Sequence, residues 1–266
     1  AKDAYPIIIK GLKRLEYRGY DSAGIALNSH GTLNIYKKQG KVSNLEAFAA
    51  DKDCSGTSGI GHTRWATHGE PNDVNAHPHY STDGKLALIH NGIIENYNSI
   101  KKELINKGYS FRSETDTEAL VHLVDDISKK EGVWFGEALR IALNHVVGAY
   151  AIVAISSDYP DRLVAARKSS PLVVGVGEDG EYFCASDASP IVEYTKNVVY
   201  MEDEEIAVID RKEGLKLYNI GDQPKTPYIQ KLELELEALE KGGYEHFMLK
   251  EIHEQPRSIQ DCFRGR

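Results

Sequence analysis

The sequence predicts an α+β protein in which sheets and helices stack as separate layers. Strand-like segments gather before residue 95 and again from Ala149 onward, and a run of helical segments lies between them. This order is typical of stacked layers and differs from the alternating order of a β-α-β wind. A hydrophobic content of 41% and a charged content of 27% over 266 residues are ordinary for a globular chain with a substantial core.

The chain begins with an amphipathic helix, because apolar residues recur at helical spacing. These residues are Tyr5, Ile8, Ile9, Leu12 and Leu15. Asp3 precedes them and is a candidate N-cap. A polar, glycine-bounded turn over 17–24 follows, and the segments 25–27 and 33–36 are predicted to pair as a hairpin.

The central part of the chain combines two strands with three helices. Strands are expected over 60–67 and 86–94, with polar residues at their ends. The helices are expected over 97–106, 118–128 and 136–145, and the segment 113–116 supplies capping groups for the second of them. Short turns then separate a series of predicted strands at 149–155, 163–166, 172–176, 182–184, 198–201 and 206–209.

The composition changes around residues 223–227, where two prolines occur close together. We therefore expect one domain over 1–224, and a linker with an appended segment over 225–266. In this segment Ile229, Leu232, Leu236 and Leu239 form a heptad-like apolar stripe, and a second helical pattern follows Gly243. So short a segment cannot bury its own stripe, so it should dock on the first domain or on a partner.

Charge and cysteine content argue against several classes of protein. The net charge is −8 and no block of Lys and Arg dominates, so binding to nucleic acid or to a membrane surface is not expected. No apolar run is long enough to cross a bilayer, and the first residues lack a signal-peptide core. The cysteines, Cys54, Cys184 and Cys262, are odd in number and far apart, which favours a reduced cytoplasmic location.

The segment His62 to Gly69 carries the first candidate binding residues. Arg64 offers a planar and permanently charged guanidinium that suits a carboxylate. Trp65 could belong to a core, but its place beside an arginine and a polar loop favours a lid over a pocket.

The segment His90 to Asn96 carries candidate groups for stabilising an oxyanion. Asn91 offers a side-chain N–H, and Gly92 beside it offers an unhindered backbone N–H. Asp116 precedes an apolar helix, so it is either an N-cap or a partner for the ammonium group of a substrate, and the sequence leaves both roles open.

Three other patterns fit their apparent chemistry poorly. Four histidines lie close together near Cys54, at positions 62, 68, 77 and 79, but their spacing matches no common zinc motif and no metal site is predicted. The G-x-G-x-x-G string at 175–180 runs on into a strand, so it predicts a hairpin turn and not a dinucleotide site. Cys54 is the one loop-borne thiol, and no base is placed beside it.

Several long motifs together resemble the glutaminase domain (class II glutamine amidotransferase) of the glucosamine-6-phosphate synthase family. The matching segments are 14–24, 62–69, 75–79, 90–96 and 113–118. The resemblance runs from the first residues to the break at 223–227, and 244–256 resembles the start of that family's sugar-phosphate isomerase half. Related amidotransferases that use other acceptors would be expected to vary the segments 17–24 and 64–69.

The resemblance implies the four-layer α/β/β/α sandwich of N-terminal-nucleophile hydrolases, followed by a C-terminal helical appendage. It implies that Arg64, helped by Thr67 and His68, holds the α-carboxylate of glutamine, and that Asp116 holds its α-ammonium. It also implies an oxyanion hole of Asn91 and Gly92, a gate at Trp65, and a place for Arg18 near the nucleophile. Neither a metal nor an organic cofactor is implied.

In the resembling family the nucleophile is a Cys at the processed N-terminus, whose own α-amine serves as the base. The strand that opens with this Cys would precede Ala1 by about eight residues. The 266 residues do not include it, so by themselves they are expected to bind parts of glutamine without hydrolysing it.

The resemblance implies that the intact protein supplies ammonia for converting fructose-6-phosphate to glucosamine-6-phosphate, in the route to UDP-N-acetylglucosamine. Its implied partners are glutamine, glutamate, its own isomerase half and a second copy in a homodimer. The alternative from another class is a non-catalytic module of the same fold, which binds glutamine or serves as a scaffold through the helices of 228–266.

Overall fold

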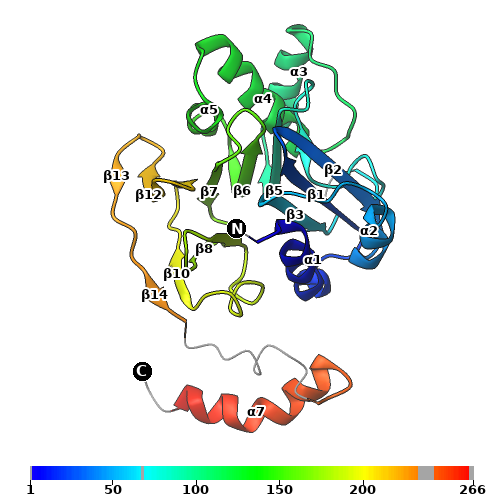
Figure 1. The fold of residues 1–266 in the computed structure, drawn as a ribbon, viewed down its shortest axis with the longest axis vertical. Helices are drawn as coiled ribbons and strands as arrows, with labels where there is room; N and C mark the ends of the chain where they lie inside the picture. The colour runs from blue at the N-terminus through cyan, green and yellow to red at the C-terminus, as the bar shows by residue number, and fades with distance from the viewer. Residues whose placement is uncertain (1, 67–68, 233–242, 264–266) are drawn as a thin grey trace.

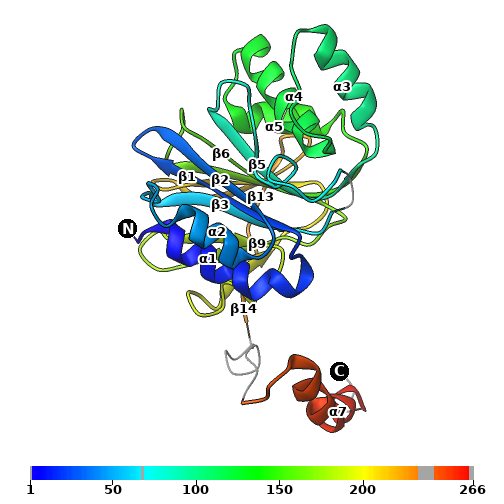
Figure 2. The ribbon, with the colours of Figure 1, turned by 90° about the vertical axis from the view of Figure 1, so that its right-hand side faces the viewer.

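The strands of the protein form two facing layers, and helices cover the outer side of each (Figures 1 and 2). The computed structural model describes residues 2–66, 69–232 and 243–263. Over this part of the chain the strands make three sheets, of seven, four and three strands. The four layers follow the order helix, sheet, sheet, helix, as predicted.

The seven-stranded sheet is one of the two inner layers, and its strands pair in the order β13-β12-β11-β7-β6-β5-β4. Its longest pairing joins β5 to β6 in antiparallel register, from Leu86 opposite Ser156 to Ile94 opposite Gly148. The strands are β4 (His79–Tyr80), β5 (Leu86–Ile94), β6 (Gly148–Ser156), β7 (Arg162–Lys168), β11 (Glu205–Asp210), β12 (Gly214–Asn219) and β13 (Pro224–Lys225).

The other inner layer consists of two smaller sheets, with strand orders β2-β1-β3 and β14-β10-β8-β9. β1 and β2 form a hairpin across His30 and Gly31, which both have positive φ as a tight two-residue turn requires. The strands are β1 (Ser22–Ser29), β2 (Thr32–Gln39), β3 (Ser58–Arg64), β8 (Val173–Val176), β9 (Tyr182–Ala185), β10 (Asn197–Tyr200) and β14 (Gln230–Lys231).

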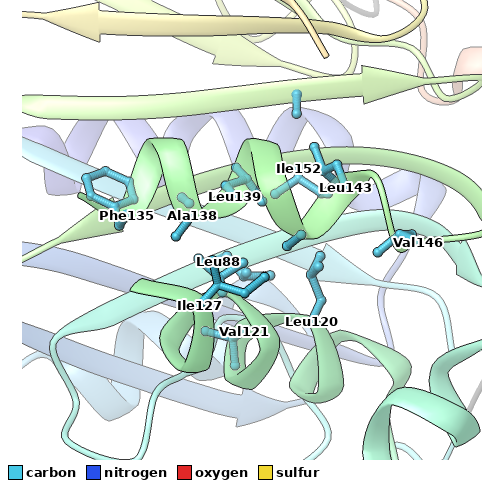
Figure 3. Close-up of a cluster of buried hydrophobic side chains, with 14 of the residues drawn as sticks. Leu88, Leu120, Val121, Ile127, Phe135, Ala138, Leu139, Leu143, Val146 and Ile152 are labelled. Carbon is cyan, nitrogen blue, oxygen red and sulfur yellow. The ribbon is translucent and has the colours of Figure 1, made fainter. Parts of the chain in front are cut away.

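Three helices cover the outer face of the seven-stranded sheet: α3 (Tyr97–Asn106), α4 (Asp116–Glu131) and α5 (Phe135–Leu143). Fully buried side chains such as Leu120, Leu139 and Ile152 fill the space between these helices and the sheet (Figure 3). On the opposite side of the molecule, α1 (Ala4–Leu15) and α2 (Val42–Ala49) pack on β1 and its neighbours. A third apolar cluster lies between the two sheet layers and includes Ala151, Val153 and Val174.

Most predicted elements are present, several with shifted ends. The helix over 97–106 and the strand over 86–94 are confirmed at their predicted bounds, whereas the strand predicted over 60–67 ends at Arg64. α2 and β12 were not predicted. Asp3 occupies the N-cap position of α1, but its side chain makes no capping hydrogen bond.

The C-terminal part differs from its prediction at one point. Gln230 and Lys231 form a strand that pairs with β10, where a helical stripe was expected, and Leu232 packs among buried apolar residues. Leu236 and Leu239 lie outside the described residues. The second helical pattern is confirmed as α7 (Phe247–Phe263), which lies apart from the layered body in both views (Figures 1 and 2). The division at 224/225 stays a prediction.

A three-residue 3-10 helix, η1 (Glu16–Arg18), connects α1 to the turn before β1. Within the described residues, we find no helix with both the length and the apolar character needed to cross a membrane.

Candidate functional site

A cavity of about 1090 Å³ lies between the two sheet layers and is the candidate site. Arg18, Arg64 and Trp65 line it on one side, and Asn91, Gly92 and Asp116 also contribute to its lining. The fold therefore brings together every predicted site residue that the structure describes. Thr67 and His68 lie outside the described residues.

Two strand edges border this cavity along their full length. All residues of β3, from Ser58 to Arg64, and all residues of β9, from Tyr182 to Ala185, contribute to its lining. Both strands are the last in their sheets. Apolar side chains also line the cavity, among them Ile60 of β3, Val153 of β6 and Leu172.

Arg64 is the last residue of β3, and its side chain is buried. Its guanidinium donates to the backbone oxygens of Gly69, at 3.2 Å, and Glu70, at 3.4 Å, which ties the loop after the strand to the site. Burial lowers the pKa of Arg64, and the charges of Asp21 and Asp116 act in the opposite direction. The carboxylates therefore help to keep a buried cation charged.

Trp65 directly follows β3 and is 64% exposed. Its ring meets Tyr20 edge-on, with 6.0 Å between the ring centres. Asp21 accepts a hydrogen bond from the backbone N–H of Ala66. This arrangement fixes the chain on either side of an exposed aromatic side chain at the cavity. Arg18, in η1, forms an ion pair of 3.8 Å with Asp187.

Asn91 and Gly92 lie in β5, on the opposite sheet layer from β3. Asn91 Oδ1 is 2.8 Å from His62 Nε2, so the amide is held from across the layers. Gly92 has a φ of +129°, and a Cβ there would come within 2.1 Å of the Ala149 backbone oxygen. The backbone beside Asn91 can take this shape only with glycine.

Asp116 is the first residue of α4, and its role as an N-cap is excluded by the structure. Thr115 is the N-cap, since its side chain accepts from the backbone N–H of Glu118 at 3.3 Å. Asp116 Oδ2 instead accepts from the backbone N–H of Ile94 at 2.8 Å. The carboxylate thus joins the helix to β5 two residues after Gly92.

The sequence analysis considered His62 and His77 only as metal ligands, whereas in the structure both are buried, stack on each other and line the cavity. The His62 and His77 rings lie parallel, 4.3 Å apart, and His77 Nδ1 accepts from the backbone N–H of His90 at 3.3 Å. Burial lowers the pKa of His62 to about 4, and lowers those of His77 and His90 as well. The signal was present in the sequence, because His62 stands two residues before Arg64 and therefore faces the same side of the strand.

No group of three or more His, Cys, Asp or Glu side chains suited to a metal ion occurs among 2–66, 69–232 and 243–263. Cys184 lines the cavity, but burial raises the pKa of its thiol to about 12, which makes it a poor nucleophile. Cys54 packs beside α1 and α2, and its Sγ lies 3.6 Å from the Ala49 oxygen. The string at 175–180 is confirmed as a hairpin turn between β8 and β9.

Comparison with known proteins identifies the kind of domain. The family model described as "Glutamine amidotransferase domain" matches residues 62–193. The chain is 62% identical over 266 residues to glutamine–fructose-6-phosphate aminotransferase (isomerizing) of Bacteroides thetaiotaomicron, covering 100% of this chain and 43% of that protein. The protein of the same name from Chlorobaculum tepidum is 53% identical over 269 residues, again covering 100% of this chain and 43% of the relative. The chain thus spans less than half the length of these relatives.

A solved structure has the same fold. It is the glutamine phosphoribosylpyrophosphate amidotransferase of B. subtilis complexed with ADP and GMP, with a TM-score of 0.69 and 29% identity over 82% of this chain and 47% of that one. The α+β sandwich is therefore that of the amidotransferases of the N-terminal-nucleophile hydrolase type. Residues 62–193 match the glutamine amidotransferase domain family, and the chain as a whole matches the glutaminase part of enzymes named glutamine–fructose-6-phosphate aminotransferase.

Proposed function

We propose that this domain hydrolyses glutamine to glutamate and passes the released ammonia to fructose-6-phosphate, which is bound by another part of the whole protein. The observation that carries the proposal is that one cavity is lined by Arg64, Asp116, Asn91 and Gly92. These groups match the carboxylate, the ammonium and the developing oxyanion of a glutamine undergoing acyl transfer.

Glutamine would lie with its α-amino-acid end between Arg64 and Asp116. Both side chains are buried and of opposite charge, so each favours the group of the substrate that bears the charge opposite to its own. Thr67 and His68 would assist Arg64, and Trp65 would close the cavity and guide the leaving ammonia. Arg18 would lie near the nucleophile.

The nucleophile is proposed to be a Cys that opens a strand preceding Ala1 and lying between β3 and β9. The Ala4 backbone N–H donates to the Gly56 oxygen at 2.8 Å, two residues before β3 begins. Lys2 forms an ion pair of 2.9 Å with Glu181, the residue before β9. A strand running back from there along β3 would need about seven residues, at roughly 3.3 Å each, to reach Arg64. The cavity borders and the expected strand length therefore agree.

In this mechanism the α-amine of the Cys takes the thiol proton, and the thiolate sulfur bonds to the amide carbon of glutamine. Asn91 Nδ2–H and the Gly92 N–H stabilise the oxyanion, and the C–N bond then breaks as the nitrogen takes up the proton and leaves as ammonia. Water cleaves the resulting thioester to give glutamate and the free thiol. No cofactor or metal takes part in these steps.

The acceptor and partners are proposed from the relatives. Their names specify glutamine and fructose-6-phosphate, and the 62% identity is more than twice the 29% identity to the phosphoribosylpyrophosphate enzyme. We place the glutaminase domain at 1–224, with 225–266 leading into the isomerase half, in a cytoplasmic homodimer.

The test is Arg64→Ala in the complete enzyme, with glutamate release from glutamine as the measurement. We expect kcat/KM for glutamine to fall by about 10²–10³-fold, because the substrate carboxylate loses its charged partner. Synthesis of the amino sugar from free ammonia should stay within about twofold, since it bypasses the glutamine site.

Arg140→Ala is the matched control, because Arg140 also donates to a backbone oxygen, that of Ile220 at 2.9 Å, but lies on α5 and does not line the cavity. It should leave glutamine use within about twofold of the parent enzyme. Unchanged glutamine kinetics in Arg64→Ala would contradict the carboxylate assignment. Absence of glutamate release from the complete parent enzyme would favour a non-catalytic module.

A further inference from the structure

We infer that His62 is a positioning residue for the oxyanion hole: it donates from Nε2–H to Asn91 Oδ1 and thereby turns the Asn91 Nδ2 toward the cavity. The inference rests on the proposed function, because the orientation of this amide matters only to a reaction that develops an oxyanion.

The contact joins the two sheet layers at the site. His62 Nε2, on β3, and Asn91 Oδ1, on β5, are 2.8 Å apart. An asparagine amide has one acceptor oxygen and one donor nitrogen, so whichever end faces His62 leaves the other end for the substrate. The donor or acceptor state of a single ring nitrogen therefore decides what Asn91 offers to the cavity.

The other ring nitrogen of His62 settles where the proton lies. His62 Nδ1 is buried and has no hydrogen-bond partner in the described part of the chain. A proton on Nδ1 would make it a buried donor without an acceptor, which native proteins rarely tolerate. An unprotonated Nδ1 without a partner costs less free energy. Burial lowers the His62 pKa to about 4, so near neutral pH the ring carries one proton, and we assign it to Nε2.

Neighbouring groups hold the ring in this place. His77 stacks on it with ring centres 4.3 Å apart and an interplanar angle of 20°. His77 is in turn fixed by the backbone N–H of His90, the residue just before Asn91. The His90 ring contacts Thr117 Oγ1 at 3.1 Å, next to Asp116. The stacked His77 thus holds the His62 ring in place, and the His62 ring in turn holds the Asn91 amide.

The test is a double-mutant cycle in the complete enzyme, with glutamate release from glutamine as the measurement. His62→Phe keeps a ring for stacking but removes the donor. We expect it to lower kcat by about 10–100-fold, with KM for glutamine within about threefold. In the Asn91→Ala background, His62→Phe should lower kcat by less than about twofold, because His62 then has no amide to orient.

A conservative variant separates positioning from packing. Gln at position 62 can place an amide N–H close to where His62 Nε2–H lies, so His62→Gln should keep kcat within about fivefold of the parent. The pH profile of kcat should keep its acid limb in His62→Gln, because His62 is not proposed to transfer a proton. If His62→Phe fails to fold, His62→Leu takes its place in the cycle.

The two proposals fail in different ways. Equal losses from His62→Phe with and without Asn91 would show that the ring acts through packing alone and would overturn the inference. A shifted acid limb in His62→Gln would also overturn it, because it would indicate proton transfer by His62. If the complete parent enzyme releases no glutamate, the proposed function fails instead.

Discussion

The space between the helices and the seven-stranded sheet and the space between the two sheet layers are filled by different kinds of side chain. Between the seven-stranded sheet and helices α3 to α5, apolar side chains pack closely, and many are fully buried (Figure 3). Between the two sheet layers an apolar cluster borders the cavity of about 1090 Å³, whose lining includes an arginine, an aspartate and histidines. The side chains packed between helices and sheet contribute stability, and the space between the two sheets holds the groups suited to chemistry.

The difference reflects the cost of burying charge. Polar groups can remain inside a protein only when other groups satisfy them. Between the two sheets, Arg64 donates to backbone oxygens and Asp116 accepts from a backbone N–H, so both charged side chains are satisfied by main-chain groups. Mutations in the two places should therefore have different effects. Those at the cavity should lower glutamine use, and those under the helices should lower stability.

The largest effect is expected from Gly92→Ala, at the cavity. A Cβ there would lie 2.1 Å from the Ala149 oxygen, with a φ of +129° that alanine rarely adopts. We expect kcat/KM for glutamine in the complete enzyme to fall by about 10³-fold or more, since β5 must shift away from β6.

Gly132→Ala is its control, because Gly132 also has a positive φ, of +67°, but nothing lies within 4 Å of the added Cβ. It should cost about 1 kcal/mol of stability and leave glutamine use unchanged. Equal loss of glutamine use in both variants would mean that backbone strain alone matters and the cavity position does not.

The next effect is expected under the helices, from Leu139→Ala. Leu139 is fully buried between α5 and the sheet, so its truncation should lower the free energy of unfolding by about 3 kcal/mol. Urea unfolding of the 266-residue chain measures this. Glutamine kinetics per folded molecule of the complete enzyme should be unchanged. A large drop in kcat/KM would contradict the claim that residues under the helices affect stability alone.

The smallest effect is expected at Glu118, in the first turn of α4, and it depends on pH. Burial acts to raise the pKa of Glu118. The His122 ring, whose Nε2 lies 3.6 Å from Oε1, and hydrogen bonds from Ser113 and the Arg112 backbone outweigh burial and lower the pKa to about 2. The folded pKa lies below the unfolded value, so the stabilisation is complete above about pH 4.5 and is lost as the pH falls toward 2.

Glu118→Gln should therefore be less stable than the parent chain by about 2 kcal/mol near pH 7, with the difference shrinking near pH 3. Urea unfolding of both chains at the two pH values measures it. A difference that does not change between them would show that Glu118 acts through its hydrogen-bonding shape and not through its charge.

Much of the element order could be predicted because it depends on local periodicity. The apolar spacing predicted the helix at 97–106 and the strand at 86–94 at their observed bounds. α2 escaped prediction because its eight residues give a short pattern. The helical stripe expected across Gln230 and Lys231 was wrong, because pairing with β10 overrides the local pattern there.

For the site, the sequence by itself determined the types of residue and their local places: an arginine at the end of a strand, and an Asn-Gly pair in another. Only the tertiary structure decided which of them meet. β3, β5 and the start of α4 are distant in sequence, and local spacing carries no information about contacts between them. The role of Asp116 shows this best, since its bond to Ile94 N, with Thr115 taking the cap, became evident only when helix and strand were packed together.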